Sequence, residues 1–229
     1  MKIKRYSLYI TLRGIIRPFL MIAYKLVVKG LENIPKTGGL IICANHTSNA
    51  DALLLAISMK RFVRFMTKSE LYKNPLLAFF LRKLGSFPVK RKNADRNALD
   101  TSIEILKNGE VLGIFIEGTR SKSGELLRPK SGAAMIAMKS NMPILPVCIT
   151  CAEKRGPVKA FLKTKIEFGR VIHTEKIISR EQIIIEDRKI LQEVKNSKST
   201  LKLGGMLKTH LKLVNEAVMT QISNMKAEV

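Results

Sequence analysis

A histidine and an aspartate five positions apart, His46 and Asp51, are the side chains of this sequence best suited to acid–base chemistry. On an unbroken helix, five steps of ~100° each would leave them about 140° apart and out of contact. If His46 lies in a loop and Asp51 in the first turn of the next helix, the carboxylate can reach one imidazole nitrogen. It would then fix the tautomer and favour the cation formed when the other nitrogen takes a proton. The pair predicts a general base; the alternative is a loop histidine beside an aspartate that stabilises a helix N-terminus.

The residues between this pair supply no obvious nucleophile. Thr47, Ser48 and Asn49 are all favourable N-caps, so the helix is expected to begin among them. Ser48 is better explained as a cap than as a nucleophile, because no nucleophile-elbow glycines flank it. The group that the base would activate therefore stays unassigned by these residues alone.

Positively charged side chains follow the other expected strands. Lys68 follows the second strand, Arg91 the third, and Arg120 the fourth, within the run Glu117-Gly118-Thr119-Arg120. In open α/β sheets, ligands gather beyond the carboxyl ends of the strands. One histidine and three cations at successive strand ends predict a base beside an anion-binding site.

The elements that must position these side chains alternate between short apolar runs and helix-like stretches, which is typical of an α/β domain. The expected strands are Leu40–Ala44, Phe62–Thr67, Phe87–Lys90, Val111–Ile116, Ile144–Thr150 and Lys165–Phe168, and the expected helices are Ala50–Met59, Pro75–Leu84, Asn97–Asn108 and Ala133–Ser140. The strands lack polar alternation, which favours a sheet covered on both faces. We predict one twisted, mostly parallel sheet covered by helices, in a domain of residues 31–178. Residues 179–229 are predicted as a helical extension packed on that domain, with helices Glu181–Val194 and Met206–Met225.

Residues 1–30 form a basic and strongly apolar stretch with seven cations and no acidic residue. Between Tyr6 and Val28 no uncharged run is longer than Pro18–Tyr24, which is far shorter than the ~20 residues that cross a bilayer. We expect an amphipathic membrane-associating segment whose cations meet anionic headgroups; the alternative is a helix packed on its own domain. The apolar run Leu76–Leu81 is expected as a core helix, with a second membrane-facing surface as its alternative.

The composition restricts the class of protein. A net charge of +23 attracts polyanions, which could be phospholipid, nucleic acid or an acidic carrier protein. A disordered basic tail is excluded because 46% of the residues are hydrophobic, and 6% aromatic residues without a recognition motif argue against nucleic-acid binding. Three cysteines favour a reducing compartment over a disulfide scaffold. Cys148 and Cys151 should face opposite sides of a strand, so no metal site is predicted.

A series of ordered blocks between Leu31 and Val147 closely resembles the lysophosphatidic acid acyltransferase (1-acyl-sn-glycerol-3-phosphate acyltransferase) family of glycerophospholipid acyltransferases. His46 and Asp51 match its His-x4-Asp motif, flanked by the expected Asn45 and Ser48. The further blocks are Lys68-Ser69-Glu70-Leu71, Gly85-Ser86-Phe87-Pro88-Val89-Lys90-Arg91, Phe115-Ile116-Glu117-Gly118-Thr119-Arg120-Ser121, Pro129-Lys130-Ser131-Gly132-Ala133-Ala134 and Pro143-Ile144-Leu145-Pro146-Val147.

This resemblance implies transfer of a fatty acyl group from a thioester donor to the free hydroxyl of a lysophosphatidate, giving phosphatidic acid. His46 would deprotonate that hydroxyl as it attacks the thioester carbonyl, and Asp51 would hold the imidazole. The substrate supplies the nucleophile, so no covalent acyl-enzyme is needed.

The resemblance also implies a substrate-binding set. Arg120, Lys68 and Arg91 would bind the acceptor's phosphate, and Gly118, beside Thr119, would let the backbone approach it. Glu117 would either bond the acceptor's glycerol oxygens or orient Arg120.

No cofactor is expected, because acyl-coenzyme A or an acyl carrier protein thioester serves as co-substrate. The expected partners are an anionic membrane surface, the lysophospholipid and the donor, at the cytoplasmic face, with no nucleic acid. Glycerol-3-phosphate or another lysophospholipid stays open as the acceptor. So does, from another class, a basic nucleic-acid- or membrane-surface-binding protein without catalysis.

Overall fold

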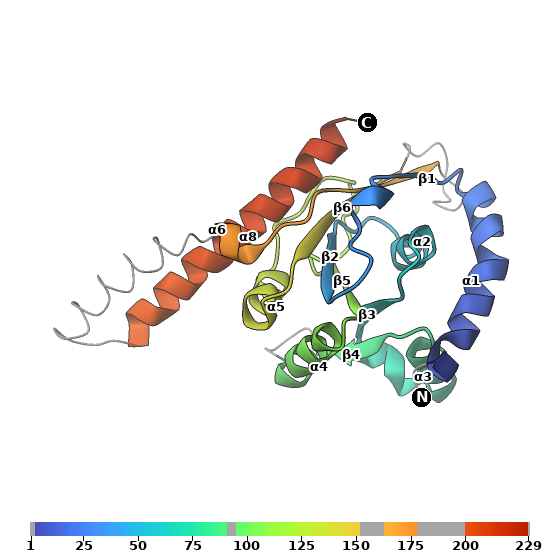
Figure 1. The fold of residues 1–229 in the computed structure, drawn as a ribbon, viewed down its shortest axis with the longest axis horizontal. Helices are drawn as coiled ribbons and strands as arrows, with labels where there is room; N and C mark the ends of the chain where they lie inside the picture. Colours follow the sequence, from blue (N-terminus) through green and yellow to red (C-terminus); the bar gives the residue numbers. More distant parts are fainter. Residues whose placement is uncertain (1–2, 91–94, 152–162, 178–199, 229) are drawn as a thin grey trace.

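The computed structural model describes residues 3–90, 95–151, 163–177 and 200–228, with side chains described from Tyr9 onward except at Leu12 and residues 200–207. Its centre is a seven-stranded sheet in the order β1-β7-β6-β2-β5-β3-β4 (Figure 1). Neighbouring strands are parallel except β6 and β7, which are antiparallel. The predicted single, mostly parallel sheet is therefore confirmed. The strands are β1 (Val27–Lys29), β2 (Leu40–Ala44), β3 (Val63–Lys68), β4 (Phe87–Val89), β5 (Val111–Phe115), β6 (Ile144–Cys151) and β7 (Thr164–Phe168).

Helices cover both faces of this sheet. Figure 1 shows α1 and α2 on one side and α5 and α8 on the other. The helices are α1 (Ile3–Ala23), α2 (Asp51–Ser58), α3 (Pro75–Lys83), α4 (Arg96–Lys107), α5 (Gly132–Ser140), α6 (Thr174–Ile177) and α8 (Thr200–Ala227), with 3-10 turns at Leu31–Asn33 and Ser69–Lys73.

The central strand β2 shows why its sequence has no polar alternation. All five of its residues are buried. Leu40, Ile42 and Ala44 pack into the core on the α1 and α2 side, whereas Ile41 and Cys43 pack into the core shared with α4, α5 and α8. A strand covered on both faces needs apolar side chains at every position.

The C-terminal helix α8 completes that second face. Val214, Val218 and Ile222 are fully buried against the sheet, as its apolar spacing predicts. The other predicted C-terminal helix, Glu181–Val194, lies outside the described residues.

The N-terminal segment ends earlier than predicted, because residues 27–29 form β1, which pairs in parallel with β7, so the sheet begins inside the range 1–30. Within α1, Arg13 and Arg17 donate to the Ile57 carbonyl at 3.5 and 3.2 Å. Cations at the C-terminal end of α2 hydrogen-bond a carbonyl that has no partner within the helix, and they interact favourably with the negative end of the helix dipole. Within the described residues, no helix has the length and apolar character needed to cross a membrane.

The helix α3 also corrects an expectation, because it is not a core helix. Only Ala78 is buried, whereas four of its apolar side chains, at positions 76, 77, 79 and 80, are exposed. In the described structure α3 contacts the 3-10 turn Ser69–Lys73 and α1, and these contacts leave the four side chains exposed. Short-range periodicity identified the helix but could not show which elements would cover it.

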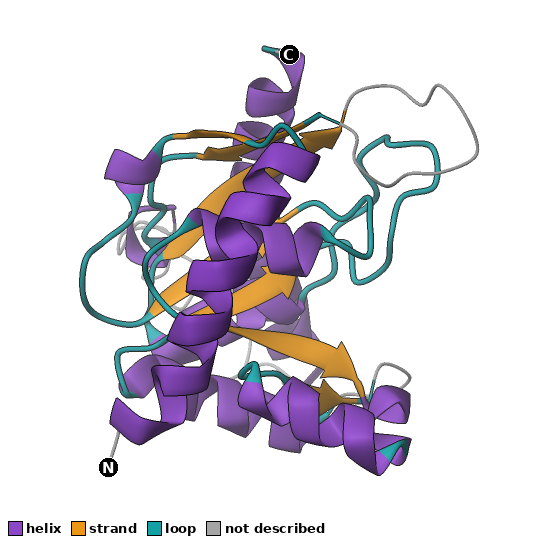
Figure 2. Ribbon diagram, turned by 90° about the vertical axis from the view of Figure 1, so that its right-hand side faces the viewer, coloured by secondary structure: helices purple, strands orange, loops and turns teal. Residues whose placement is uncertain are grey.

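The parallel strands direct their carboxyl ends toward one edge of the sheet. In Figure 2 most arrowheads point to the side where the long loops gather. The loop between β2 and α2 and the loop between β5 and α5 both begin there, because β2 and β5 are parallel and paired in register from Leu40 and Val111. Residues 71 positions apart are thereby placed side by side.

Candidate active site

The His46–Asp51 pair forms at the carboxyl end of β2. His46 Nδ1 lies 2.8 Å from Asp51 Oδ2, and the His46 side chain is 15% exposed while that of Asp51 is fully buried. The backbone amides of Thr47 and Ser48 donate to the same oxygen at 2.6 and 2.7 Å. Two amides and an imidazole compensate the buried carboxylate. With Nδ1 engaged in this way, Nε2 is the nitrogen that can accept a proton.

The loop conformation brings the pair together as predicted. Asp51 is the first residue of α2 and His46 precedes the helix. The helix begins later than expected, because its N-cap is Ala50, which makes no side-chain cap bond. Ser48 Oγ instead accepts from the Ala50 amide at 3.2 Å, a local backbone role consistent with its interpretation as a structural serine.

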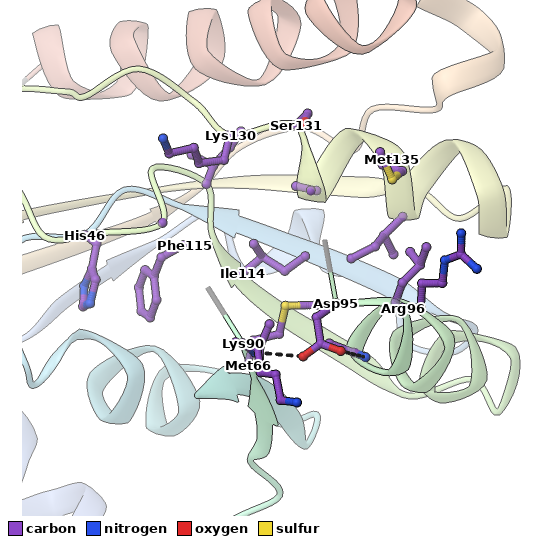
Figure 3. A pocket seen from close by; sticks show the side chains of 18 residues that line it. His46, Met66, Lys90, Asp95, Arg96, Ile114, Phe115, Lys130, Ser131 and Met135 are labelled. Atoms are coloured by element: carbon purple, nitrogen blue, oxygen red, sulfur yellow. Dashed lines mark hydrogen bonds between the residues drawn. The ribbon is translucent and has the colours of Figure 1, made fainter. Parts of the chain in front are cut away.

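Three contacts fix the position of His46. Its ring stacks on Phe115, with centroids 3.9 Å apart and planes 13° from parallel (Figure 3). Its carbonyl accepts from the Ser121 amide at 2.8 Å. The preceding Asn45 is buried and exchanges two hydrogen bonds with the backbone of Ile149, at 2.9 and 2.7 Å. The end of β2 is thus held by both neighbouring strands, which preorganises the imidazole.

The loop after β5 contains a buried carboxyl and a left-handed glycine. Glu117 is 1% exposed and its Oε1 accepts from the Leu127 amide at 3.1 Å. Burial raises the pKa of this carboxyl above its ordinary value, against the opposing effects of the Leu127 amide and His46. Gly118 has φ +68°, and a β-carbon there would stand 3.2 Å from Lys130 Cγ. The left-handed backbone favours glycine at this position, and a larger residue would crowd the lysine stem that packs over it.

An apolar cavity of about 490 Å³ extends from His46 between the sheet and the helices α4 and α5. Figure 3 shows His46 and Phe115 at one end, with Ile114 and Met66 further along. Lys130 lies over the same end of the cavity. The lining residues are His46, Met66, Val89, Lys90, Asp95, Arg96, Ala98, Leu99, Ile114, Phe115, Ile116, Gly118, Lys130, Ser131, Gly132, Ala133, Met135 and Ile136.

A second, polar cavity of about 470 Å³ lies on the other side of the same two loops. It contains the cations Arg120 and Lys122 and no acidic lining residue. Arg120 is oriented by Asn49, whose side-chain oxygen accepts from its guanidinium. The lining residues are Tyr24, Thr47, Ser48, Asn49, Ala50, Thr119, Arg120, Ser121 and Lys122. Two cations among hydroxyl and amide groups suit a phosphate.

The structure gathers some of the predicted site residues and separates others. His46 and Gly118 line the apolar cavity, and Thr119 and Arg120 line the polar one. Lys68 lines neither and pairs instead with Glu70 at 3.4 Å, because β3 lies on the far side of β5 from β2.

The remaining predicted residues are Glu117 and Arg91. Glu117 lines neither cavity and bonds backbone amides, among them that of Leu127, whereas Arg120 donates to Asn49. Arg91 lies outside the described residues.

Sequence reasoning missed several residues that the fold places at the site. Phe115 and Lys130 stood within recognised blocks but received no role, and Asn49 was considered only as a cap. The available signal was sequence position, because Phe115 ends a strand, and Asn49 and Lys130 lie just before helices that follow the two strand exits. Lys122 and Tyr24 gave no signal, since their approach depends on packing of distant elements.

No three His, Cys, Asp or Glu side chains gather as a metal site within the described ranges. On β6, Cys148 is buried and Cys151 is exposed, and both are free thiols. Burial raises the pKa of the Cys148 thiol to about 12.

A mostly parallel α/β sheet with a histidine–carboxylate pair at its carboxyl edge, between an apolar and a cationic cavity, defines a class of enzyme. A histidine held by a buried carboxylate in this way can take a proton from a substrate hydroxyl. The acyltransferase family model matches residues 25–150, a range that contains both cavity-forming loops. The chain therefore belongs to the acyltransferase family.

Individual relatives agree with this assignment. The 1-acyl-sn-glycerol-3-phosphate acyltransferase of Bacillus subtilis is 29% identical over 74% of this chain and 86% of its own length. The protein of the same name from Borreliella burgdorferi is 31% identical over 62% of this chain and 58% of its own length. Among solved structures, the 1-acyl-sn-glycerophosphate (LPA) acyltransferase PlsC from Thermotoga maritima matches with a TM-score of 0.59 and 30% identity, over 82% of this chain and 81% of that one.

Proposed function

We propose that this acyltransferase moves a fatty acyl group from an acyl thioester to the free hydroxyl of lysophosphatidic acid and so forms phosphatidic acid. The observation that carries the proposal is the position of His46, bonded to Asp51, between a cavity suited to a hydrocarbon chain and one suited to a phosphate. The names of the relatives support the choice of acceptor.

In the proposed reaction, His46 Nε2 takes the proton of the acceptor hydroxyl while Asp51 stabilises the imidazolium. The hydroxyl oxygen forms an ester bond to the thioester carbonyl carbon, and the carbon–sulfur bond breaks. The departing thiolate receives the proton back from His46, which balances the step. No serine of the loop is needed, because the nearest one, Ser48, serves the backbone.

The two cavities support a division of the substrates. The donor's acyl chain fits the cavity lined by Ile114, Met66 and their neighbours, because burial of methylene groups is favourable there. The acceptor's phosphate fits beside Arg120, whose guanidinium offers a bidentate fork. Either acyl-coenzyme A or an acyl carrier protein can deliver the acyl chain, and no cofactor is required for this chemistry.

The proposed site of action is an anionic membrane surface at the cytoplasmic face. Exposed apolar side chains support this, among them Ile15 and Phe19 on α1 and Leu76 and Phe79 on α3. The basic residues Arg82 and Lys83 at the end of α3 complement anionic headgroups. Exposed apolar side chains favour a lipid surface over nucleic acid, for which a stacking platform would be expected.

The test is an assay of the purified protein that crosses two donors, oleoyl-coenzyme A and oleoyl-acyl carrier protein, with three acceptors. These are oleoyl-lysophosphatidic acid, lysophosphatidylcholine and glycerol-3-phosphate. We expect phosphatidic acid as the main product. His46→Ala should abolish it, whereas the exposed control His173→Ala should retain full activity. A wild-type protein that binds vesicles but turns over no thioester would refute the enzymatic proposal.

A further inference from the structure

The polar cavity and the N-terminal helix meet at one residue, Tyr24. This residue follows the last turn of α1 and lines the cavity that also contains Arg120 and Lys122. Its backbone carbonyl accepts from the Thr164 amide at 2.9 Å, which ties the end of α1 to the sheet. The end of α1 therefore forms part of the wall of the cavity and is fixed there.

The two cavities open on opposite faces of the sheet. The apolar cavity is lined by residues of the core shared with α4 and α5, such as Ile116 and Ile136. Tyr24 and Ala50, which line the polar cavity, pack against the core beneath α1 and α2. No residue lines both cavities. A ligand whose phosphate occupies the polar cavity thus has α1, and not the apolar cavity, as its apolar neighbour.

Two large apolar side chains near the C-terminal end of α1 are exposed. Phe19 is 65% exposed and Ile22 is 79% exposed. They precede Tyr24 by five and two residues, so both lie within roughly 8 Å of it along the helix axis, at about 1.5 Å per residue. This distance is comparable to the glycerol backbone that joins the phosphate of a lysophospholipid to its acyl chain.

We propose that the acceptor's own acyl chain lies along the C-terminal end of α1, against Phe19 and Ile22, while Lys122 joins Arg120 on its phosphate. This inference rests on the proposed function and deepens it: the end of α1 selects a long-chain lysophosphatidate over an acceptor that carries phosphate but no chain. The two acyl chains approach His46 from opposite faces of the sheet, and only the donor's chain enters the apolar cavity.

Two double variants of α1 test where the acceptor's acyl chain lies. Phe19→Ser/Ile22→Ser is compared with Ile10→Ser/Ile15→Ser, which alters two side chains of the same helix that are 64% and 68% exposed but stand further from Tyr24. Each protein is assayed with oleoyl- and hexanoyl-lysophosphatidic acid, and its binding to phosphatidylglycerol vesicles is measured by co-sedimentation. We expect the first pair to raise the KM for the oleoyl acceptor about tenfold and to leave the hexanoyl KM nearly unchanged. The second pair should alter vesicle binding alone.

Equal changes of the oleoyl KM in both paired variants would overturn the inference, because α1 would then only attach the protein to lipid. The phosphate contact has its own test: Lys122→Gln should raise the KM for both acceptors alike, whereas the exposed Lys139→Gln should not. An unchanged KM in Lys122→Gln would remove this lysine from the site. Melting curves show whether each variant is folded. A wild-type protein without acyl transfer would refute the proposed function. An active wild-type protein whose variants keep the wild-type KM for each acceptor would refute only this inference.

Discussion

The two cavities beside His46 have nearly the same size but opposite character. One is lined mainly by aliphatic side chains of the sheet and of α4 and α5, and the other by hydroxyl, amide and cationic groups of two loops. Neighbouring residues are divided between them: His46 from Thr47, and Gly118 from Thr119. The difference teaches that the loops after two paired strands can line cavities on both faces of a sheet, because each loop changes side between two neighbouring residues. Substitutions can separate the contribution of the base from the contributions of the two cavities.

The largest effect is expected for Asp51→Asn. The amide can still accept from the Thr47 and Ser48 amides, but it cannot stabilise an imidazolium as a carboxylate does. We expect kcat to fall by roughly 10³-fold, with the KM values of donor and acceptor nearly unchanged, because general-base catalysis contributes about 10²–10⁴-fold. Steady-state kinetics with both substrates measures this, and the exposed Asp100→Asn is the control. A rise in one KM alone would place Asp51 in a single cavity.

Arg120→Ala should weaken the binding of the acceptor and leave the binding of the donor unchanged. Loss of a charged bidentate partner is expected to raise the acceptor KM about 10- to 100-fold. The donor KM should stay the same, because Arg120 does not line the apolar cavity. Kinetics at saturating donor test this, with the exposed Arg128→Ala as the matched variant. An equal loss toward both substrates would show that the cavities do not divide the substrates.

Ala133→Leu is the corresponding change on the apolar side. Ala133 is 2% exposed and lines that cavity from the first turn of α5. Added methylene groups shorten the space for a chain, so activity with oleoyl thioester should fall roughly tenfold relative to lauroyl thioester. Competition between the two donors measures the ratio, and the acceptor KM is the internal control. An unchanged donor preference would contradict the placement of the donor's chain.

The smallest effect is expected for Glu117→Gln, between the cavities. The pKa of Glu117 is raised above its ordinary 4.5, so its contribution to stability is present below that pH and is lost as the pH rises through the folded-state pKa. The amide has no such titration, so the variant's melting temperature should fall less than that of the wild type between pH 4.5 and 7. Thermal unfolding over this range tests the sign. A wild-type protein that gains stability over this range through Glu117 would contradict it.

The sequence by itself determined what depends on short stretches of chain. The pairing of His46 with Asp51, five positions apart, follows from a short loop and the first turn of the next helix. The apolar runs without polar alternation specified strands buried on both faces, and their carboxyl ends marked the functional edge. These features are local because backbone geometry and side-chain periodicity fix them before any tertiary contact forms.

The tertiary structure alone decided which distant residues meet. It bonded Arg120 to Asn49 across 71 positions, brought Tyr24 to the same cavity, and left Lys68 outside it. It also directed Arg13 and Arg17 to the end of α2 and left α3 exposed. The reason is physical: strand order and helix packing set these distances, and neither is contained in the spacing of residues within one element.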